Sequence, residues 1–138
     1  TPIASNWGYI DDTIVITFWV TGVVFVAIVL FMASMDVESD KEALFNEVYD
    51  KEHVPNLMKV PGVFAVTRLK AESFSMSIGG EERTVAVGDE PVYSAIYEID
   101  SPDVLVSQEW ADAVEAGRWP NEVRPYTKNR RHSLRKVV

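Results

Sequence analysis

The sequence predicts an α+β domain, built from an antiparallel sheet and two helices, behind a single N-terminal membrane-spanning helix. Three observations support this fold class. Residues 13–33 form a run of 21 residues without a charged side chain. The chain that follows changes between strand-like alternation and helix-like apolar spacing. Ser, Pro and Gly residues stand where helices are expected to begin and end. We therefore expect an N-terminal segment over residues 1–33 and a folded domain over residues 34–138.

The uncharged run is long enough to cross a bilayer as a helix, which takes about 20 mostly apolar residues. A buried hairpin turning at Thr21 and Gly22 is the alternative, because the run is rich in β-branched residues. Neither half of the run alternates between apolar and polar residues, however. A small domain also has few residues with which to cover both faces of such a hairpin, so we favour the membrane helix. Lysines follow the run but none precedes it. The positive-inside rule then predicts a single-pass protein of the inner (cytoplasmic) membrane with its domain in the cytoplasm.

The first helix of the domain is expected to begin at Ser39. The stretch "SDKE" (residues 39–42) has the form of a capping box, in which the Ser39 hydroxyl accepts a hydrogen bond from an early helix amide and Glu42 reaches back. Apolar residues at helical spacing follow, and "VPGV" (residues 60–63) ends the helix.

The rest of the domain predicts three strands and a second helix. The segments with strand-like patterns are residues 62–72, 92–99 and 124–138. Gly79 and Gly80 form a turn in an excursion at the sheet edge between the first two. Ser101 is the expected N-cap of the second helix, and Gly117 ends it.

A ferredoxin-like βαββαβ sheet needs one further strand in front of the first helix. The natural candidate, residues 30–37, overlaps the end of the uncharged run. We therefore place the end of the membrane helix near Met32 and a short first strand over residues 33–37. A junction between two unrelated pieces of sequence is an alternative that the residues leave open.

The charge distribution argues against nucleic-acid binding. The chain has 13 Lys and Arg against 21 Asp and Glu, a net charge of −8 and a pI near 4.7. Seven of the basic residues fall in residues 118–138, which hold a single acidic one, so a basic segment follows an acidic body. The absence of cysteine excludes disulfides, thiolate metal sites and cysteine nucleophiles.

The domain resembles a known superfamily in three stretches: "MDVESDKEALFNEVYDKEHVPNLMKVPGVFAVTRLKAE", "YSAIYEIDSPDVL" and "GRWPNEVRPYTKNRRH". These are similar to the dimeric α+β barrel superfamily, in particular its EthD-like branch, over about residues 31–138. The resemblance implies ferredoxin-like units that form a homodimer through their sheets. Relatives include cofactor-free monooxygenases, lactone isomerases and haem-degrading enzymes, but catalysis is not universal among them.

The N-terminal segment carries a separate and weaker resemblance. The stretch "SNWGYIDDTIVITFWVTGVVFVAIVLFMA" (residues 5–33) is similar to the first transmembrane helix of some bacterial cytochrome c oxidase subunit II chains. Without cysteine, the thiolate-bridged dicopper centre of that family is not expected. Electron entry through copper is therefore excluded, whereas residence in the lipid bilayer beside a larger membrane complex stays open.

His53 is the first candidate for chemistry. An imidazole with a pKa near 6.5 is the side chain best suited to proton transfer at neutral pH. In the resembling superfamily, a histidine at this place lines the cleft between helix and sheet, which implies a general base or a ligand. The alternative is a simple cap at a helix C-terminus. Tyr49 lies one turn earlier and is expected on the same face, although a core position is the commoner role for such a tyrosine.

The stretch "GRWPNEVRPYTKNRRH" supplies further candidates. Arg118 and Arg124 flank Trp119, giving bidentate donors for a carboxylate beside an aromatic wall. Alternation along the last strand places four side chains on one face: Tyr126, Lys128, Arg130 and His132. Inside a barrel, that face would form a cationic cavity for an anionic or phenolate-like molecule. The alternative, which we favour slightly, is that these arginines pair with the acidic body or with a second subunit.

Two functions follow from these patterns. The first is a membrane-anchored, cofactor-independent small-molecule enzyme or ligand-binding protein. Its expected catalytic residues are His53, Tyr49, Arg124 and Tyr126, and its expected ligand-binding residues are Arg118, Trp119, Arg130 and His132. No metal is expected, because the two histidines lack metal-ligand spacing. The alternative is a non-catalytic, single-helix accessory subunit of a larger membrane complex, such as a respiratory one.

Overall fold

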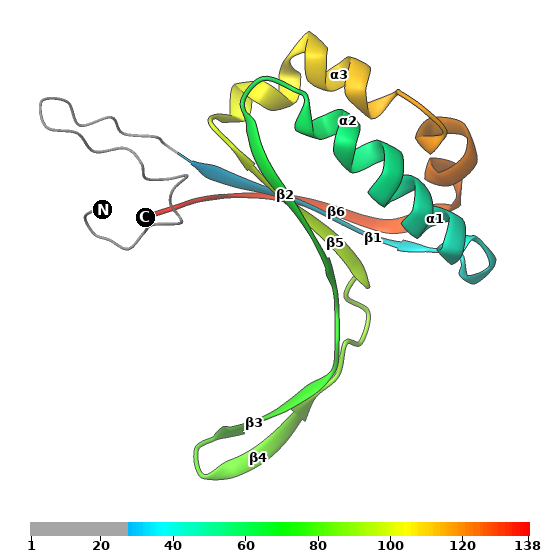
Figure 1. Ribbon diagram of the computed structural model, residues 1–138. Coiled ribbons are helices and arrows are strands. Elements are labelled where there is room, and N and C mark those ends of the chain that lie inside the picture. The colour runs from blue at the N-terminus through cyan, green and yellow to red at the C-terminus, as the bar shows by residue number, and fades with distance from the viewer. Residues whose placement is uncertain (1–27) are drawn as a thin grey trace, which may run out of the picture.

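The computed structural model describes residues 28–138, in which a four-stranded antiparallel sheet carries helices on one face (Figure 1). The strands of the sheet are β1 (Val29–Val37), β2 (Val63–Lys70), β5 (Tyr93–Ile99) and β6 (Thr127–Lys136). Their order in space is β2-β5-β1-β6. Helical connections follow β1 and β5, so the arrangement is the predicted α+β fold of ferredoxin-like βαββαβ type.

The first strand begins earlier than the sequence predicted. Val29 already pairs with Ile99 of β5 and with Lys136 of β6. The prediction that a helix extends to Met32 or Ala33 is therefore wrong for residues 29–33. The first five residues of β1, residues 29–33, are all apolar and therefore resemble membrane sequence, whereas Ser34 and Asp36 follow within the same strand. The remainder of the predicted membrane helix, residues 13–27, lies outside the described residues. Within residues 28–138, no helix has the length and apolar character to cross a membrane.

The first helical connection starts at Ser39, as predicted, but not through a capping box. Residues Ser39–Lys41 form a 3₁₀ turn, and α1 (Glu42–Val48) follows without a side-chain cap. The helix then widens into a π-helical turn, Tyr49–His53, and continues as α2 (Val54–Met58). Its inner face is fully buried against the sheet through Phe45, Val48 and Leu57.

The second helical connection contains two capped elements where the sequence predicted one helix. The Ser101 side chain accepts from the backbone N–H of Asp103 and begins a 3₁₀ turn, Pro102–Val106. Ser107 then accepts from the N–H of Trp110 and begins α3 (Gln108–Val114). A second N-cap within six residues explains the break, because each serine satisfies the amides of its own turn.

The predicted excursion at the sheet edge is a β-hairpin. It consists of β3 (Phe74–Ile78) and β4 (Glu81–Val85), with Gly79 and Gly80 at the turn. The hairpin continues from the end of β2 and projects from the sheet on the side away from the helices (Figure 1).

Replacing Gly62 by alanine is expected to lower the free energy of unfolding by about 1–3 kcal/mol. Gly62 has a φ of 93°, and an added Cβ would lie 2.6 Å from Cγ2 of Val104. Urea unfolding of both proteins measures the change. The control is Gly79→Ala, because Gly79 also has a positive φ, of 62°, but an added Cβ there meets no atom of residues 28–138 within 4 Å. Equal losses in the two variants would contradict the role of the Val104 contact.

Candidate functional site

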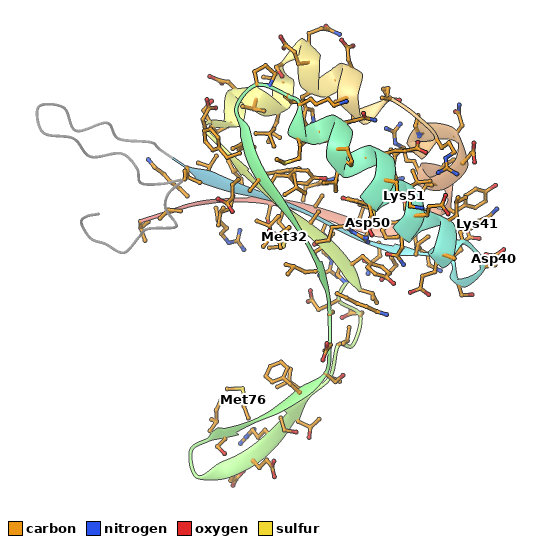
Figure 2. The ribbon with its side chains drawn as sticks, in the orientation of Figure 1. Met32, Asp40, Lys41, Asp50, Lys51 and Met76 are labelled. Carbon is orange, nitrogen blue, oxygen red and sulfur yellow. The ribbon has the colours of Figure 1, made fainter. Side chains whose placement is uncertain are left out.

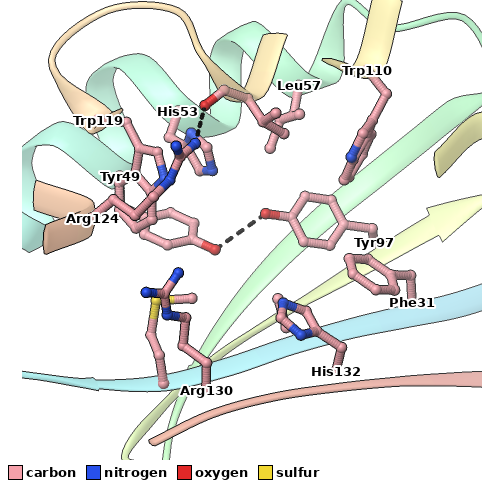
Figure 3. A pocket seen from close by; sticks show the side chains of 13 residues that line it. Phe31, Tyr49, His53, Leu57, Tyr97, Trp110, Trp119, Arg124, Arg130 and His132 are labelled. Carbon is pink, nitrogen blue, oxygen red and sulfur yellow. Dashed lines mark hydrogen bonds between the residues drawn. The ribbon is translucent and has the colours of Figure 1, made fainter. Parts of the chain in front are cut away.

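A cavity of about 180 Å³ lies between the sheet and the helices (Figure 3). Strands β1, β5 and β6 form its floor, and the π-helical turn, α3 and the segment after it form its walls. Its lining residues are Phe31, Ala33, Met35, Tyr49, His53, Leu57, Tyr97, Trp110, Val114, Trp119, Arg124, Arg130 and His132. The cavity therefore contains six of the eight site residues predicted from the sequence, and Arg118 and Tyr126 do not line it.

The π-helical turn brings Tyr49 and His53 to the cavity. The N–H of Val54 bonds to the carbonyl of Tyr49, five residues earlier, so the helix is wider here than an α-helix. Such widened turns occur frequently at functional sites. Tyr49 and His53 are 3% and 5% exposed, and their ring centres lie 5.1 Å apart. The expectation that they share a face is confirmed.

His53 is a neutral imidazole at physiological pH. Its ring stacks on Trp119, with centres 4.3 Å apart and planes 19° from parallel. Burial foremost, and then the nearby Arg124 guanidinium, lower the pKa of His53 to about 4, against the opposing charge of Glu115. Its Nδ1 atom is buried and has no hydrogen-bond partner among the described residues. An unpaired buried polar atom is costly, so this nitrogen marks a place where a further group would be stabilising.

Tyr49 and Tyr97 form a hydroxyl pair at the centre of the cavity. Their oxygen atoms are 3.1 Å apart (Figure 3). Burial raises the pKa of both phenols, that of Tyr97 well above its ordinary value. Both hydroxyls are therefore protonated at neutral pH. The bond between them uses one hydrogen, so the second remains available for donation to a ligand oxygen.

Arg118 does not line the cavity but stabilises its wall through hydrogen bonds. Its Nε donates to Glu52 at 2.6 Å, its Nη2 to Glu47 at 3.1 Å, and its backbone N–H to Glu52 at 2.9 Å. These hydrogen bonds, the backbone one foremost, lower the pKa of Glu52. The contacts hold the segment after α3 against the first helix, which keeps Trp119 over His53.

Arg124 lines the cavity while its charge is balanced by a neighbour. Its guanidinium donates to both carboxylate oxygens of Glu115, at 3.1 and 2.8 Å, and to the carbonyl of Val114 at 2.9 Å. The expectation that arginines of this segment pair with the acidic body thus holds for Arg118 and Arg124.

A β-bulge in β6 separates residues that the sequence placed together. Asn129 has a φ of 52°, and the pairing of β6 with β1 shifts by one residue at this point. After the shift, His132 lies opposite Ala33, on the face below the helices. Before it, Lys128 lies opposite Asp36, on the other face. The prediction of one shared face is therefore wrong for Lys128.

Tyr126 also lies apart from the cavity. It belongs to a 3₁₀ turn, Arg124–Tyr126, that precedes β6. Its ring lies under Nζ of Lys41, which is 4.5 Å from the ring centre. Because the residue precedes the strand, strand alternation does not apply to it.

Arg130 and His132 carry positive or titratable groups to the cavity rim. His132 stacks on Phe31, with ring centres 5.9 Å apart. Arg130 makes no ion pair within residues 28–138. Its charge is therefore available to an anion that enters the cavity. The same part of the chain contains no group of three or more His, Asp or Glu side chains suited to a metal ion.

Sequence reasoning missed Tyr97, the partner of Tyr49. A usable signal was present, because alternation along "VYSAIYEI" places Tyr93, Ala95, Tyr97 and Ile99 on one face. All four are buried under the helices. An aromatic hydroxyl on the inner face of a central strand requires a polar partner, and this requirement was the signal from which the pair with Tyr49 could have been predicted.

The same fold occurs in solved structures of low sequence identity. An EthD-family protein of Bacillus halodurans has a TM-score of 0.51 and 16% identity, over 80% of this chain and 99% of that one. A putative antibiotic biosynthesis monooxygenase of Bordetella bronchiseptica has a TM-score of 0.53 and 13% identity, over 81% and 98%. The chain shares the α+β fold of these proteins. The heme-degrader MhuD of Mycobacterium tuberculosis, solved with two hemes in its active site, shares this α+β barrel fold at a TM-score of 0.50 and 14% identity, over 80% and 95%. No family model matches the chain.

A different relative matches a short part of the chain. Over 33 residues, 79% are identical to the alternative cytochrome c oxidase subunit 2 of Bradyrhizobium diazoefficiens. The match covers 24% of this chain and 12% of the relative. Both resemblances predicted from the sequence are therefore confirmed, one to the α+β barrel proteins and one to a respiratory subunit.

Proposed function

We propose that the α+β barrel domain binds a small anionic molecule in its cavity and exchanges a proton with it at His53. The observation that carries this proposal is the buried, neutral His53, whose Nδ1 has no hydrogen-bond partner within residues 28–138, beside the Tyr49–Tyr97 hydroxyl pair. A closed core with no function would fill such a space with apolar side chains.

Each polar group has a separate role in the proposed site. The charge of Arg130, which lines the cavity, attracts the anion. The free hydroxyl hydrogen of the tyrosine pair donates to a ligand oxygen. His53 accepts a proton from a bound anion that still carries one, such as a carboxylate with a hydroxyl group, whose hydroxyl oxygen then takes the negative charge. The bound charge raises the pKa of His53 toward the neutral range in which a general base is effective. These steps need no cofactor.

The size of the cavity limits the ligand. At about 180 Å³, it lies below the roughly 300 Å³ at which drug-sized pockets begin. A phenolate or a short carboxylate is of suitable size. A porphyrin such as the one in MhuD is at least drug-sized and does not fit a cavity of this volume, so no step of the proposal involves haem.

Binding of 4-nitrophenolate, followed by its absorbance, tests the proposal. We expect saturable binding of 4-nitrophenolate and no saturable binding of its neutral methyl ether. Arg130→Gln is expected to weaken binding by about tenfold to a hundredfold, because a charge-assisted hydrogen bond contributes about 1.5–3 kcal/mol. The matched control is Arg131→Gln. Arg131 lies opposite Ser34 on the other face of the sheet and pairs with Glu90. Equal weakening by both variants, or equal binding of the ether, would refute an anion site at Arg130.

The second candidate function is a non-catalytic accessory subunit of a membrane complex, favoured by the 33-residue match to an oxidase subunit. Because β1 begins at Val29, the uncharged residues ahead of it are 13–28, just under the roughly 17 needed to span. The 33-residue match therefore supports this function more strongly than the length of the uncharged run does. Extraction in mild detergent, followed by size separation and mass spectrometry, tests it. Migration with a large complex supports it, and migration of the chain alone counts against it.

A further inference from the structure

Arg68 is a charged residue on the inner face of the sheet, beneath the first helix. In the pairing of β2 with β5 it lies opposite Ala95, which is fully buried. The Arg68 side chain is only 19% exposed. Its Nη1 donates to Asp50 at 2.8 Å, and its Nη2 donates to the side-chain oxygen of Asn46 at 2.8 Å. Figure 2 shows Asp50 on the first helix, beside the sheet. A charge in this position needs such partners, and both of them belong to the helical segment that carries Tyr49.

The guanidinium of Arg68 lies over the ring of Tyr49. Its central carbon is 4.6 Å from the centre of that ring, and 5.4 and 5.7 Å from the ring centres of Phe45 and Tyr93. A cation within about 6 Å of a ring centre is attracted to the negative face of the ring. Tyr49 lines the cavity, whereas Arg68 does not. Arg68 therefore adjoins the site through Tyr49, without contact with a bound molecule.

A cation beside one phenol makes the two hydroxyls of the Tyr49–Tyr97 pair unequal. Burial raises the pKa of both phenols, and the charge of Arg68 opposes this rise. The pKa of Tyr97 lies further above its ordinary value than that of Tyr49. Each hydroxyl can donate or accept, and the more acidic one is the better donor and the poorer acceptor. The unequal pair thus has a preferred direction for its hydrogen bond.

We propose that Arg68 sets this direction, so that Tyr49 donates to Tyr97 and Tyr97 donates to the ligand. This role rests on the proposed function, in which His53 takes the proton of a ligand hydroxyl and the negative charge stays on the ligand oxygen. A hydroxyl that accepts a hydrogen bond is a stronger donor in turn. The connected groups therefore stabilise the ligand oxygen as its charge develops. Arg68 is a positioning residue, and Tyr97 is the group that touches the ligand.

Binding of 4-nitrophenolate distinguishes the two tyrosines, because its oxygen already carries a negative charge. Tyr97→Phe is expected to weaken binding by about tenfold to a hundredfold, as for the loss of a hydrogen bond to a charged group. Tyr49→Phe and Arg68→Gln are each expected to weaken it by only about threefold, because they reduce polarisation and leave the donor in place. A larger loss in Tyr49→Phe than in Tyr97→Phe would overturn the proposal.

The double variant tests whether Arg68 acts through the Tyr49 hydroxyl. Tyr49→Phe keeps the ring beneath the guanidinium and removes only the hydroxyl. In Tyr49→Phe chains, Arg68→Gln is therefore expected to cause no further weakening of 4-nitrophenolate binding. An additional loss in the double variant, equal to that of Arg68→Gln alone, would show that Arg68 acts independently of the pair and would overturn the proposal.

Asp50→Asn is the matched control for a purely structural role. It breaks the same ion pair as Arg68→Gln but leaves the cation over Tyr49, where Asn46 still accepts from Nη2. The NMR resonance of the Tyr49 Cζ atom, followed during alkaline titration of the ligand-free protein, measures the pKa of its phenol. We expect this pKa to rise in Arg68→Gln and to fall in Asp50→Asn. A shift in the same direction in both variants would overturn the proposal.

The two kinds of measurement separate this proposal from the function on which it rests. If the wild-type protein does not bind 4-nitrophenolate, the proposed function fails, and the titration of the ligand-free protein still decides whether Arg68 acts on Tyr49. If the wild-type protein binds 4-nitrophenolate and the opposite shifts are missing, the proposed function stands and the role of Arg68 is refuted.

Discussion

Replacing Trp119 by alanine is expected to lower the free energy of unfolding by about 3–5 kcal/mol and to raise the pKa of His53 from about 4 toward 6.5. Trp119 is 5% exposed and contacts His53 by stacking and Tyr49 edge-on. Without the indole, water reaches the imidazole and stabilises its charged form. Urea unfolding measures the first effect, and NMR titration of the imidazole carbon resonances measures the second.

Trp110→Ala is the matched control for this variant. Trp110 lines the same cavity from α3, but its aromatic contacts are with Phe31 and Tyr97, not with His53. We expect a loss of stability without a comparable change in the pKa of His53. A titration that stays near 4 in Trp119→Ala would show that other groups keep water from the imidazole.

The second large effect is a pH dependence of stability that belongs to His53. Its pKa is about 4 in the folded chain and about 6.5 in the unfolded chain. Between these values the unfolded chain binds more protons, so stability falls as the pH falls from 6.5 to 4 and levels off below that. From pH 7 to pH 5 the loss is about 2 kcal/mol. Urea unfolding at the two pH values measures it.

His53→Phe keeps an aromatic ring against Trp119 and removes the titrating group. The variant is expected to lack the loss of about 2 kcal/mol between pH 7 and pH 5. The pKa values of Glu52 and Glu115 are lowered by their arginine partners. The stability that they contribute is therefore lost only at lower pH, outside this window. A pH dependence that persists unchanged in His53→Phe would assign it to other groups.

Local signals in the sequence were sufficient for most of the fold. Alternation predicted β2 and β5, the paired glycines at 79 and 80 predicted the hairpin turn, and Ser101 is an N-cap as expected. The start of β1 at Val29 could not be read in this way. Residues 29–33 at the start of this strand are apolar at every position, as a membrane helix is, and the sequence of this stretch alone does not distinguish the two structures.

The candidate site shows the same division between local and distant causes. His53 and Tyr49 were predictable because their spacing along one helix decides their common face. The role of Arg118 was not, since its partners Glu47 and Glu52 are distant in the sequence and meet it only in the folded chain. The bulge at Asn129 likewise depends on its side chain reaching Asp36, on the neighbouring strand.

The widened turn at Tyr49–His53 makes the length of the first helix critical to the site. Residues of an α-helix advance about 100° around its axis at each step. Removing one residue from this turn would give a regular α-helix with better hydrogen-bond geometry. It would also rotate one half of the helix against the other, so that Phe45 and Leu57 could not both face the sheet. Packing against the sheet thus fixes the orientation of both ends of the helix about its axis. The additional residue of the π-helical turn therefore remains between them, where it directs His53 into the cavity.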